Sequence, residues 1–400
     1  MHYHSEQTRL SLLRMQSAVE MYGRDCRVVR WAYIYRRLRN KIWWQYRRQF
    51  LSLFTKGPVQ DNRLHVFWHL RGGVGDVAAA RLAVLAMRQQ LPHAVFYYHA
   101  DSAQACSAVF VQDEKNIFLP SGEPLWYKYD IAFELCQSFQ LVHIKQKRVE
   151  VLAPDFLPIL EKIQQRQKDF SFFLKDSYLL EDLLGQWMWN QGLKRLDLHS
   201  YLSGLDFDVE ATPALPAGLI HQEILKKYNL SGKKYITLHD GIDAGFQLNG
   251  ARALKCWSIE NWRDLARLIK AAYPDFLLVQ LGGKNSPKFD FADICLVGKT
   301  ALADLPSLLN SSSLHIDGES GLVQLSRYLQ NKCLVLFGPT DKPYFQISKN
   351  INVKENACQS CMWLFGPQWH TQCVLGHETC LNMKALTSSH VFQFVKDVLK

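Results

Sequence analysis

Apolar runs alternate with helical stretches over the first half of the chain. Residues 64–68 form a continuous apolar run typical of a buried strand, and a short glycine-rich segment follows them. Residues 77–91 are rich in Ala, Leu and Arg and predict a helix, and residues 94–98 predict the next strand. Strand, helix and strand in this order indicate a parallel sheet, which the apolar runs at 131–135 and 141–144 extend.

The alternation returns more clearly in the second half. Five apolar runs predict strands at residues 235–239, 276–281, 294–297, 314–316 and 333–337. The stretches between them predict helices at residues 258–272, 302–310 and 319–329. This alternation predicts a second doubly wound α/β domain.

The length of 400 residues exceeds one ordinary core, so we expect two domains. Residues 150–230 are less regular and favour helices, and Pro213, Pro216 and Gly218 mark a joint between the domains. We therefore expect two Rossmann-like domains, preceded by a helical extension. The expected ranges are 1–60 for the extension, 61–215 for the first domain and 216–400 for the second, with a Cys-rich tail at 358–380.

The composition is that of a globular protein, with 48% hydrophobic and 21% charged residues. No uncharged apolar stretch reaches the roughly 18 residues that a membrane-spanning helix needs. Arg9, Arg14, Glu20 and Arg24 interrupt any apolar stretch of a signal peptide. These features predict a cytoplasmic protein.

The net charge of +10 is concentrated in the N-terminal extension. Residues 1–60 hold twelve Lys or Arg and three acidic residues, interleaved with Trp and Tyr. This pattern favours the anionic surface of a membrane. A basic helix pair packed on the main body is the next alternative. Nucleic acid, where Arg meets phosphate and rings stack on bases, is the third.

Four of the ten cysteines crowd into the tail. In a chain without a secretory signal, such a cluster predicts either a metal site or a packed, reduced cluster. The spacing is not that of an ordinary zinc ribbon, but four thiolates can hold structural zinc or iron, with His370 and His377 as substitute ligands. The four residues are Cys358, Cys361, Cys373 and Cys380.

The first chemically informative segment is the glycine-rich loop at 71–76. Two open α/β sheets place a cleft at the carboxyl ends of their strands, and this loop lies there. Gly73 and Gly75 permit a tight turn, and Asp76 falls in the first turn of the following helix. Asp76 either caps that helix or serves as a general base that takes a proton from a hydroxyl group.

Three further segments predict an anion site. Residues 317–321 join a strand to a helix, where backbone N–H groups can seat a diphosphate and a carboxylate can bind ribose hydroxyls. Gly338 and Thr340 follow the next strand in the same manner. Lys255, just before a helix, can neutralise a leaving diphosphate, although a lone lysine is more often a surface charge.

Taken in order, these motifs resemble glycosyltransferase family 9, which contains the ADP-heptose:lipopolysaccharide heptosyltransferases. The matching motifs are Arg-Gly-Gly-Val-Gly-Asp at 71–76, Lys255 and Trp257 before the helix of Asn261 and Trp262, Gln-Leu-Gly-Gly at 280–283, Glu-Ser-Gly-Leu at 319–322, Leu-Phe-Gly-Pro-Thr at 336–340 and the tail residues Cys373, Gly376, His377 and Cys380.

The resemblance implies the GT-B fold, with an N-terminal acceptor domain and a C-terminal nucleotide-sugar domain. It implies metal-independent sugar transfer with inversion, in which Asp76 is the base and Gly73 and Gly75 form the acceptor-side loop. The donor-binding residues it implies are Lys255, Glu319, Ser320, Gly321, Gly338 and Thr340. Two positions depart from the family pattern, because Glu319 replaces its usual Asp and Gln324 its usual His.

The function implied is transfer of heptose from ADP-heptose to lipopolysaccharide or a related surface glycan. The acceptor would be a glycolipid, reached at the inner face of the cytoplasmic membrane through residues 1–60. One alternative is a family 9 transferase that uses another sugar nucleotide or a protein acceptor, and a more remote one is a non-enzymatic nucleic-acid-binding protein. A dehydrogenase is disfavoured because the GxGxxG motif with its following acid is missing from the sequence.

Overall fold

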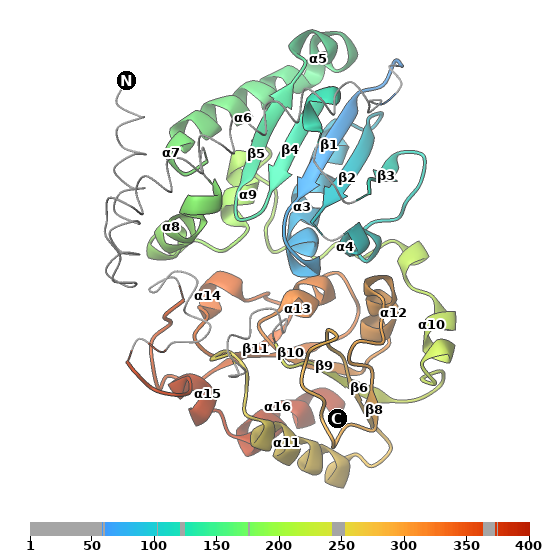
Figure 1. The fold of residues 1–400 in the computed structure, drawn as a ribbon, viewed down its shortest axis with the longest axis vertical. Coiled ribbons are helices and arrows are strands. Elements are labelled where there is room, and N and C mark those ends of the chain that lie inside the picture. Colours follow the sequence, from blue (N-terminus) through green and yellow to red (C-terminus); the bar gives the residue numbers. More distant parts are fainter. Residues whose placement is uncertain are drawn as a thin grey trace, which may run out of the picture.

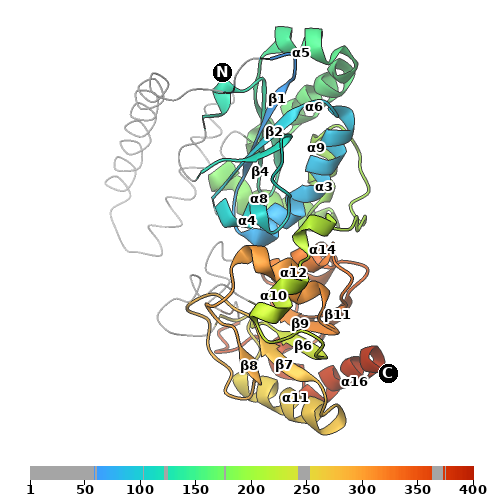
Figure 2. The same ribbon diagram turned by 90° about the vertical axis from the view of Figure 1, so that its right-hand side faces the viewer.

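Two β-sheets, each packed against helices, lie one above the other along the long axis of the molecule (Figures 1 and 2). The computed structural model describes residues 58, 61–101, 103–120, 125–174, 177–241, 253–362, 373 and 375–400. The predicted extension at 1–60 lies almost wholly outside the described residues. No helix within the described ranges is long and apolar enough to cross a membrane.

The N-terminal sheet has the strand order β3-β2-β1-β4-β5. Its strands are β1 (His65–Leu70), β2 (Val95–Ala100), β3 (Asn116–Phe118), β4 (Ile131–Leu135) and β5 (Phe139–Ile144). The first four are parallel, as predicted, but β5 pairs antiparallel with β4. The short turn between these two strands cannot hold the crossover that a parallel pair needs, so a hairpin closes this edge.

The helices of the N-terminal half pack on the sheet face formed by Val66, Trp68 and Leu70. These helices are α3 (Val74–Gln90), α4 (Ala103–Ser107), α5 (Gln146–Leu152), α6 (Leu157–Asp169), α7 (Ser171–Leu174), α8 (Ser177–Asn190) and α9 (Asp197–Leu202), with short 3-10 turns at Trp126–Lys128 and Pro154–Phe156. α3 begins three residues earlier than predicted, inside the glycine-rich loop. The reason is a cap, because the Gly73 N–H donates to the Asp76 carboxylate at 2.9 Å.

The C-terminal sheet has six strands in the order β11-β10-β9-β6-β7-β8, all parallel. They are β6 (Tyr235–Leu238), β7 (Leu277–Gln280), β8 (Ile294–Cys295), β9 (Leu314–Gly318), β10 (Cys333–Phe337) and β11 (Ile351–Lys354). β6 starts the sheet in its middle, and the chain order reverses between β6 and β9, as in a doubly wound fold. The sequence pattern missed β11, a short edge strand.

Helices cover both faces of this sheet (Figure 1). α11 (Ile259–Ala272) and α16 (Ser388–Leu399) pack on one face, where α11 buries Trp262 and Leu265. The remaining helices are α10 (Gln222–Lys227), α12 (Leu305–Asn310), α13 (Gly321–Ser326), α14 (Lys342–Phe345) and α15 (Leu381–Ala385), with 3-10 turns at Ala217–Leu219 and Leu302–Asp304. α12 and α13 lie on the face toward the N-terminal half.

The two halves touch where α3 and α13 begin. A Cβ atom added to Gly75 would lie 2.5 Å from the Cα atom of Gly321, so the two backbones are in direct contact. Further along α3, the Tyr328 hydroxyl donates to the Ala78 carbonyl at 2.7 Å, and the Arg81 guanidinium lies over the Tyr328 ring. Only glycine permits this approach at 75 and 321, and it fixes where the first turn of α3 faces the C-terminal half.

Candidate active site

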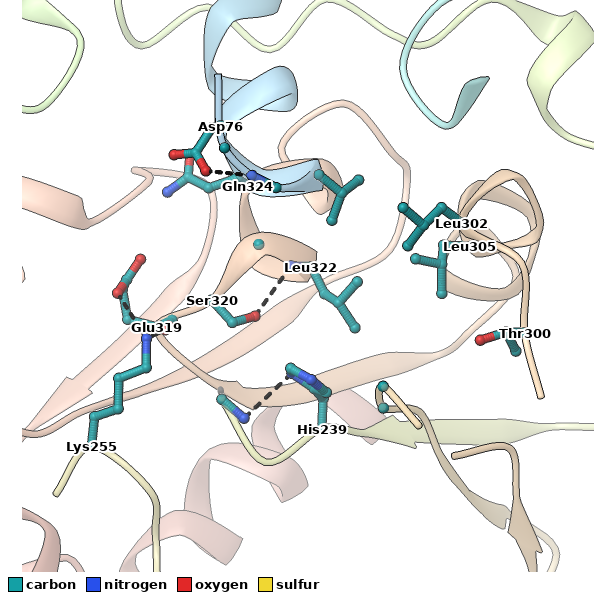
Figure 3. A pocket seen from close by; sticks show the side chains of 18 of the residues that line it. Asp76, His239, Lys255, Thr300, Leu302, Leu305, Glu319, Ser320, Leu322 and Gln324 are labelled. Atoms are coloured by element: carbon teal, nitrogen blue, oxygen red, sulfur yellow. Dashed lines mark hydrogen bonds and ion pairs between the residues drawn. The ribbon is translucent and has the colours of Figure 1, made fainter. Parts of the chain in front are cut away.

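A cleft of about 770 Å³ lies between the two halves (Figure 3). This volume is in the range of small-molecule sites. The N-terminal wall is the start of α3, and the opposite wall is formed by the carboxyl ends of the central C-terminal strands. The lining residues include Gly73, Gly75, Asp76, Arg195, His239, Gly241, Lys255, Lys284, Thr300, Glu319, Ser320, Gly321 and Gln324.

Asp76 lies on the N-terminal wall with both carboxylate oxygens engaged. One oxygen accepts the Gly73 N–H, and the other forms an ion pair with Arg195. The side chain keeps 30% of its surface exposed. Asp76 therefore caps α3 and also faces the cleft, so the two sequence-based interpretations of this residue are compatible.

Arg195, between α8 and α9, is a site residue that sequence reasoning missed. Burial alone would lower the pKa of Arg195, but the charge of Asp76 raises it, with smaller contributions from Tyr344, from Glu319 and from the hydrogen bond to Asp76, and together they outweigh burial. Its neighbour His199 is buried beside that charge, and its pKa falls to about 4. Arg195 thus stays charged and orients Asp76. No local pattern could have revealed this, because the contact joins residues far apart in the chain.

Lys255 and Glu319 meet on the C-terminal wall (Figure 3). The Lys255 ammonium donates to the Glu319 backbone carbonyl at 2.7 Å and lies 3.6 Å from its carboxylate. Both side chains are nearly buried, with exposed fractions of 12% and 10%. Ser320 follows directly, and its hydroxyl accepts the Leu322 N–H at 3.1 Å as the cap of α13. The structure therefore brings three predicted donor-side residues into one cleft.

The helix predicted at 319–329 is shorter than expected. α13 runs only from Gly321 to Ser326, because Ser320 caps it and the chain turns after Ser326. Gly321 lies against the backbone of Gly75. A Cβ atom added to Gly321 would lie 3.0 Å from the Gly75 nitrogen. Gly321 lines the cleft, and on one side it is closed off by the other half of the chain.

Gly338 and Thr340 were expected to bind the donor, but they do not line this cleft. A Cβ atom on Gly338 would lie 2.8 Å from the Met383 side chain, and Thr340 is 1% exposed. The carbonyl between them, that of Pro339, accepts the N–H groups of Cys361 and Met362. Cys361, Met362 and α15 thus lie over the end of β10, and Gly338 and Thr340 are outside this cleft.

His239 is a second site residue that sequence reasoning missed. It follows β6 directly and lines the cleft beside Gly241, whose N–H points to the ring (Figure 3). Its signal in the sequence was a polar residue at the carboxyl end of a predicted strand, two positions before a glycine.

Burial, and then the charges of the other three tail cysteines, raise the pKa of Cys361 to about 11, so these four residues lie near one another. Even so, the described residues contain no group of three or more His, Cys, Asp or Glu side chains arranged to hold a metal ion. The four residues are Cys358, Cys361, Cys373 and Cys380.

Two α/β domains that face each other across such a cleft form a GT-B-like arrangement, an architecture that many sugar-nucleotide transferases share. Residues 210–377 match the family model described as glycosyltransferase family 9 (heptosyltransferase). The predicted resemblance to this family is confirmed, and the chain is a glycosyltransferase. Comparison with curated proteins finds no match.

Solved structures share the fold over most of the chain. A family 9 glycosyltransferase from Veillonella parvula is 14% identical with a TM-score of 0.51, covering 85% of this chain and 99% of that one. The Escherichia coli ADP-heptose heptosyltransferase II is 15% identical with a TM-score of 0.51, covering 84% and 98%. The iron-containing, dodecameric glycosyltransferase TibC of enterotoxigenic E. coli is 12% identical with a TM-score of 0.52, covering 84% and 76%.

Proposed function

We propose that the chain transfers a heptose from ADP-heptose to a lipopolysaccharide or a related surface-glycan acceptor, with inversion at the anomeric carbon. One observation carries this proposal: Asp76 on one wall of the cleft faces the pair of Lys255 and Glu319 on the other. One wall thus holds a base for an acceptor hydroxyl and the other a cation for a leaving diphosphate.

Each wall of the cleft has its own role in the proposed reaction. Asp76 takes the proton of the acceptor hydroxyl as its oxygen attacks the anomeric carbon, while the bond from that carbon to the diphosphate oxygen breaks. Negative charge then grows on the diphosphate, where Lys255 stabilises it. In this proposal, Glu319 accepts hydrogen bonds from the ribose hydroxyls of the donor. Arg195 holds the Asp76 carboxylate in a single orientation, which a reaction between two bound substrates requires.

Two fold relatives support ADP-heptose as the donor. The E. coli structure is that of an ADP-heptose lipopolysaccharide heptosyltransferase, and TibC was solved in complex with ADP-D-β-D-heptose. A thermal-shift screen of ADP, UDP, GDP and CMP and their sugar conjugates tests this choice. A ligand at about 100 times its Kd adds roughly 2.7 kcal/mol of stability. A shift with another nucleotide only would replace the donor, and no shift with any would overturn the proposal.

Replacing Lys255 by Met should weaken ADP binding by about ten- to a hundredfold, because a charge-assisted bond to phosphate is lost while the stem remains. Isothermal titration calorimetry with ADP measures this. Lys270→Met is a matched control. Lys270, on α11, also pairs with a carboxylate, that of Asp293 at 3.0 Å, but it does not line the cleft. Equal ADP affinity in both variants would remove Lys255 from the donor site.

The acceptor side includes a proposed membrane contact. Residues 1–60 carry most of the net charge, and we propose that they bind the inner face of the cytoplasmic membrane, where a glycolipid acceptor is found. Nucleic acid is not expected as a partner. Flotation with anionic vesicles should carry the full chain, and a chain lacking residues 1–60 should stay behind. Retention on heparin without any sugar-nucleotide binding would favour a nucleic-acid-binding protein instead.

The cysteine cluster is proposed to take up structural zinc or iron, with no metal required for catalysis. The support is the gathering of four thiols within one short segment. Elemental analysis of protein purified without chelators should find about one zinc or iron per chain, lost on Cys358→Ser with Cys361→Ser. Metal-free protein with unchanged thermal stability would instead show a packed, reduced cluster.

A further inference from the structure

A row of buried polar side chains crosses the two central strands of the C-terminal sheet. Thr237 on β6 lies opposite His315 on β9, and the two side chains are hydrogen-bonded at 2.9 Å. The next positions on the same face are His239 and Asp317, whose side chains meet at 2.9 Å. His315 also contacts Asp317, at 3.1 Å. The row therefore runs without a break from the sheet interior to the end of β6.

The Asp317 carboxylate is the centre of this row. It is completely buried and is contacted by His239, His315 and the Ser320 hydroxyl. Burial alone would raise the pKa of Asp317, but the charge of His239 and the hydrogen bonds of both histidines lower it to about 2. A buried carboxylate is costly to the fold unless it is paired and hydrogen-bonded. Asp317 is thus a fixed negative charge directly behind His239.

His239 connects the buried Asp317 carboxylate to the surface of the cleft. Its Nδ1 atom lies 2.9 Å from the Asp317 carboxylate and 3.3 Å from the Gly241 nitrogen, and its Nε2 atom has no hydrogen-bond partner among the described residues. The ring lines the cleft and keeps 11% of its side-chain surface exposed (Figure 3). Its position is between β6 and β9, where the strand order reverses and open α/β sheets bind their ligands.

The surroundings favour the charged imidazole. Burial alone would lower the pKa of His239, but the charge and hydrogen bond of Asp317 outweigh it and raise the pKa above 6.5. The charge of Lys255, which lines the same cleft, is near enough to act on His239, and it opposes this rise in pKa by a smaller amount than Asp317 supplies. The other charged or titratable groups around His239 are Asp240, Lys284, His315 and Glu319.

We propose that His239 is a donor-binding residue whose Nε2–H binds the diphosphate of the nucleotide sugar, and that Asp317 is the positioning residue that orients its ring. This inference rests on the proposed function and names a ligand contact within that site. His239 and Lys255 both follow β6 in the chain and line the same cleft, so the negative charge of the leaving group meets two positively charged groups. Hydrogen bonds from charged donors to a diphosphate are stronger than hydrogen bonds between neutral groups.

The test compares the binding of ADP, AMP and inorganic pyrophosphate to the full chain by calorimetry. His239→Gln should weaken ADP and pyrophosphate by roughly tenfold or more and AMP by less than about threefold, because only the first two contain a diphosphate. Affinity of the wild type should fall as the pH rises through the raised pKa of His239, and this dependence should flatten in His239→Gln.

The variant Asp317→Asn tests whether Asp317 positions the ring of His239. A neutral partner removes the attraction that raises the pKa of His239, so the loss of diphosphate affinity should begin at lower pH than in the wild type. If this buried variant does not fold, His239→Gln alone decides the proposal. His390→Gln is the matched control, because His390 also pairs with a carboxylate, Glu355 at 2.6 Å, but lies on the exposed surface of α16.

The outcomes separate the two proposals. Unchanged ADP and pyrophosphate binding in His239→Gln would overturn the role of His239 and leave the proposed function standing. Binding of pyrophosphate that depends on His239, without binding of any nucleotide, would support the residue and overturn the donor. A wild type that binds neither nucleoside diphosphates nor pyrophosphate would overturn both.

Discussion

Replacing Asp76 by Asn should lower kcat by about 10²- to 10⁴-fold, because the amide keeps the shape of the side chain but cannot take the acceptor proton. Donor affinity should change little, since Asp76 lies on the wall opposite Lys255 and Glu319. Steady-state transfer assays with calorimetry of ADP binding separate the two effects. A kcat within about threefold of the wild type would exclude Asp76 as the base.

The ion pair with Arg195 calls for a second variant at this position. Asn leaves a buried guanidinium without its main counter-charge, so part of any loss could come from the fold. Asp76→Glu keeps the charge and moves the carboxylate by about one methylene. It should melt close to the wild type and still lose about 10²-fold in kcat, because a displacement of about 1 Å is enough. Asp264→Asn, on the exposed side of α11, is the control for a lost carboxylate away from the cleft.

Replacing Gly75 by Ala should reduce the rate of sugar transfer by about 10²-fold or more, because it disturbs the contact between the two domains. The new methyl group would lie 2.5 Å from the Gly321 backbone, which cannot rotate away as a side chain would. α3 must then shift, and it carries Asp76 at the next position. Ala is otherwise favoured over Gly inside a helix by about 1 kcal/mol, so local helix stability cannot explain a loss. Transfer assays and small-angle scattering measure the activity and the domain arrangement.

Gly73→Ala is the matched control for that arrangement. It adds the same methyl group to the same loop, but nothing lies within 4 Å of the new atom. Its scattering profile and melting temperature should match those of the wild type, while those of Gly75→Ala should not. If Gly75→Ala kept the wild-type domain arrangement and full activity, the contact between residues 75 and 321 would be adaptable and would not set the geometry of the cleft.

Much of the fold was predictable because its signals are local. Apolar runs of strand length, separated by amphipathic stretches such as that of α11, predicted most strands of both sheets and the helices α3, α11, α12 and α13. The glycine-rich loop placed Asp76 at the start of a helix without any knowledge of the rest of the chain. The rule that ligands bind at the carboxyl ends of parallel strands then predicted that Asp76, Lys255 and Glu319 would share one cleft, as they do.

Only the tertiary structure decided which side chains complete the cleft. Arg195 reaches Asp76 from a region without a clear pattern, and Asp317 meets His239 because β6 and β9 are neighbours although they are far apart in the chain. The sequence by itself determined the order of elements, the glycine loop and the carboxylate on it, since these depend on residues close in the chain. Packing decided the partners of each charge, because burial and counter-charges come from segments that meet only when both domains are folded.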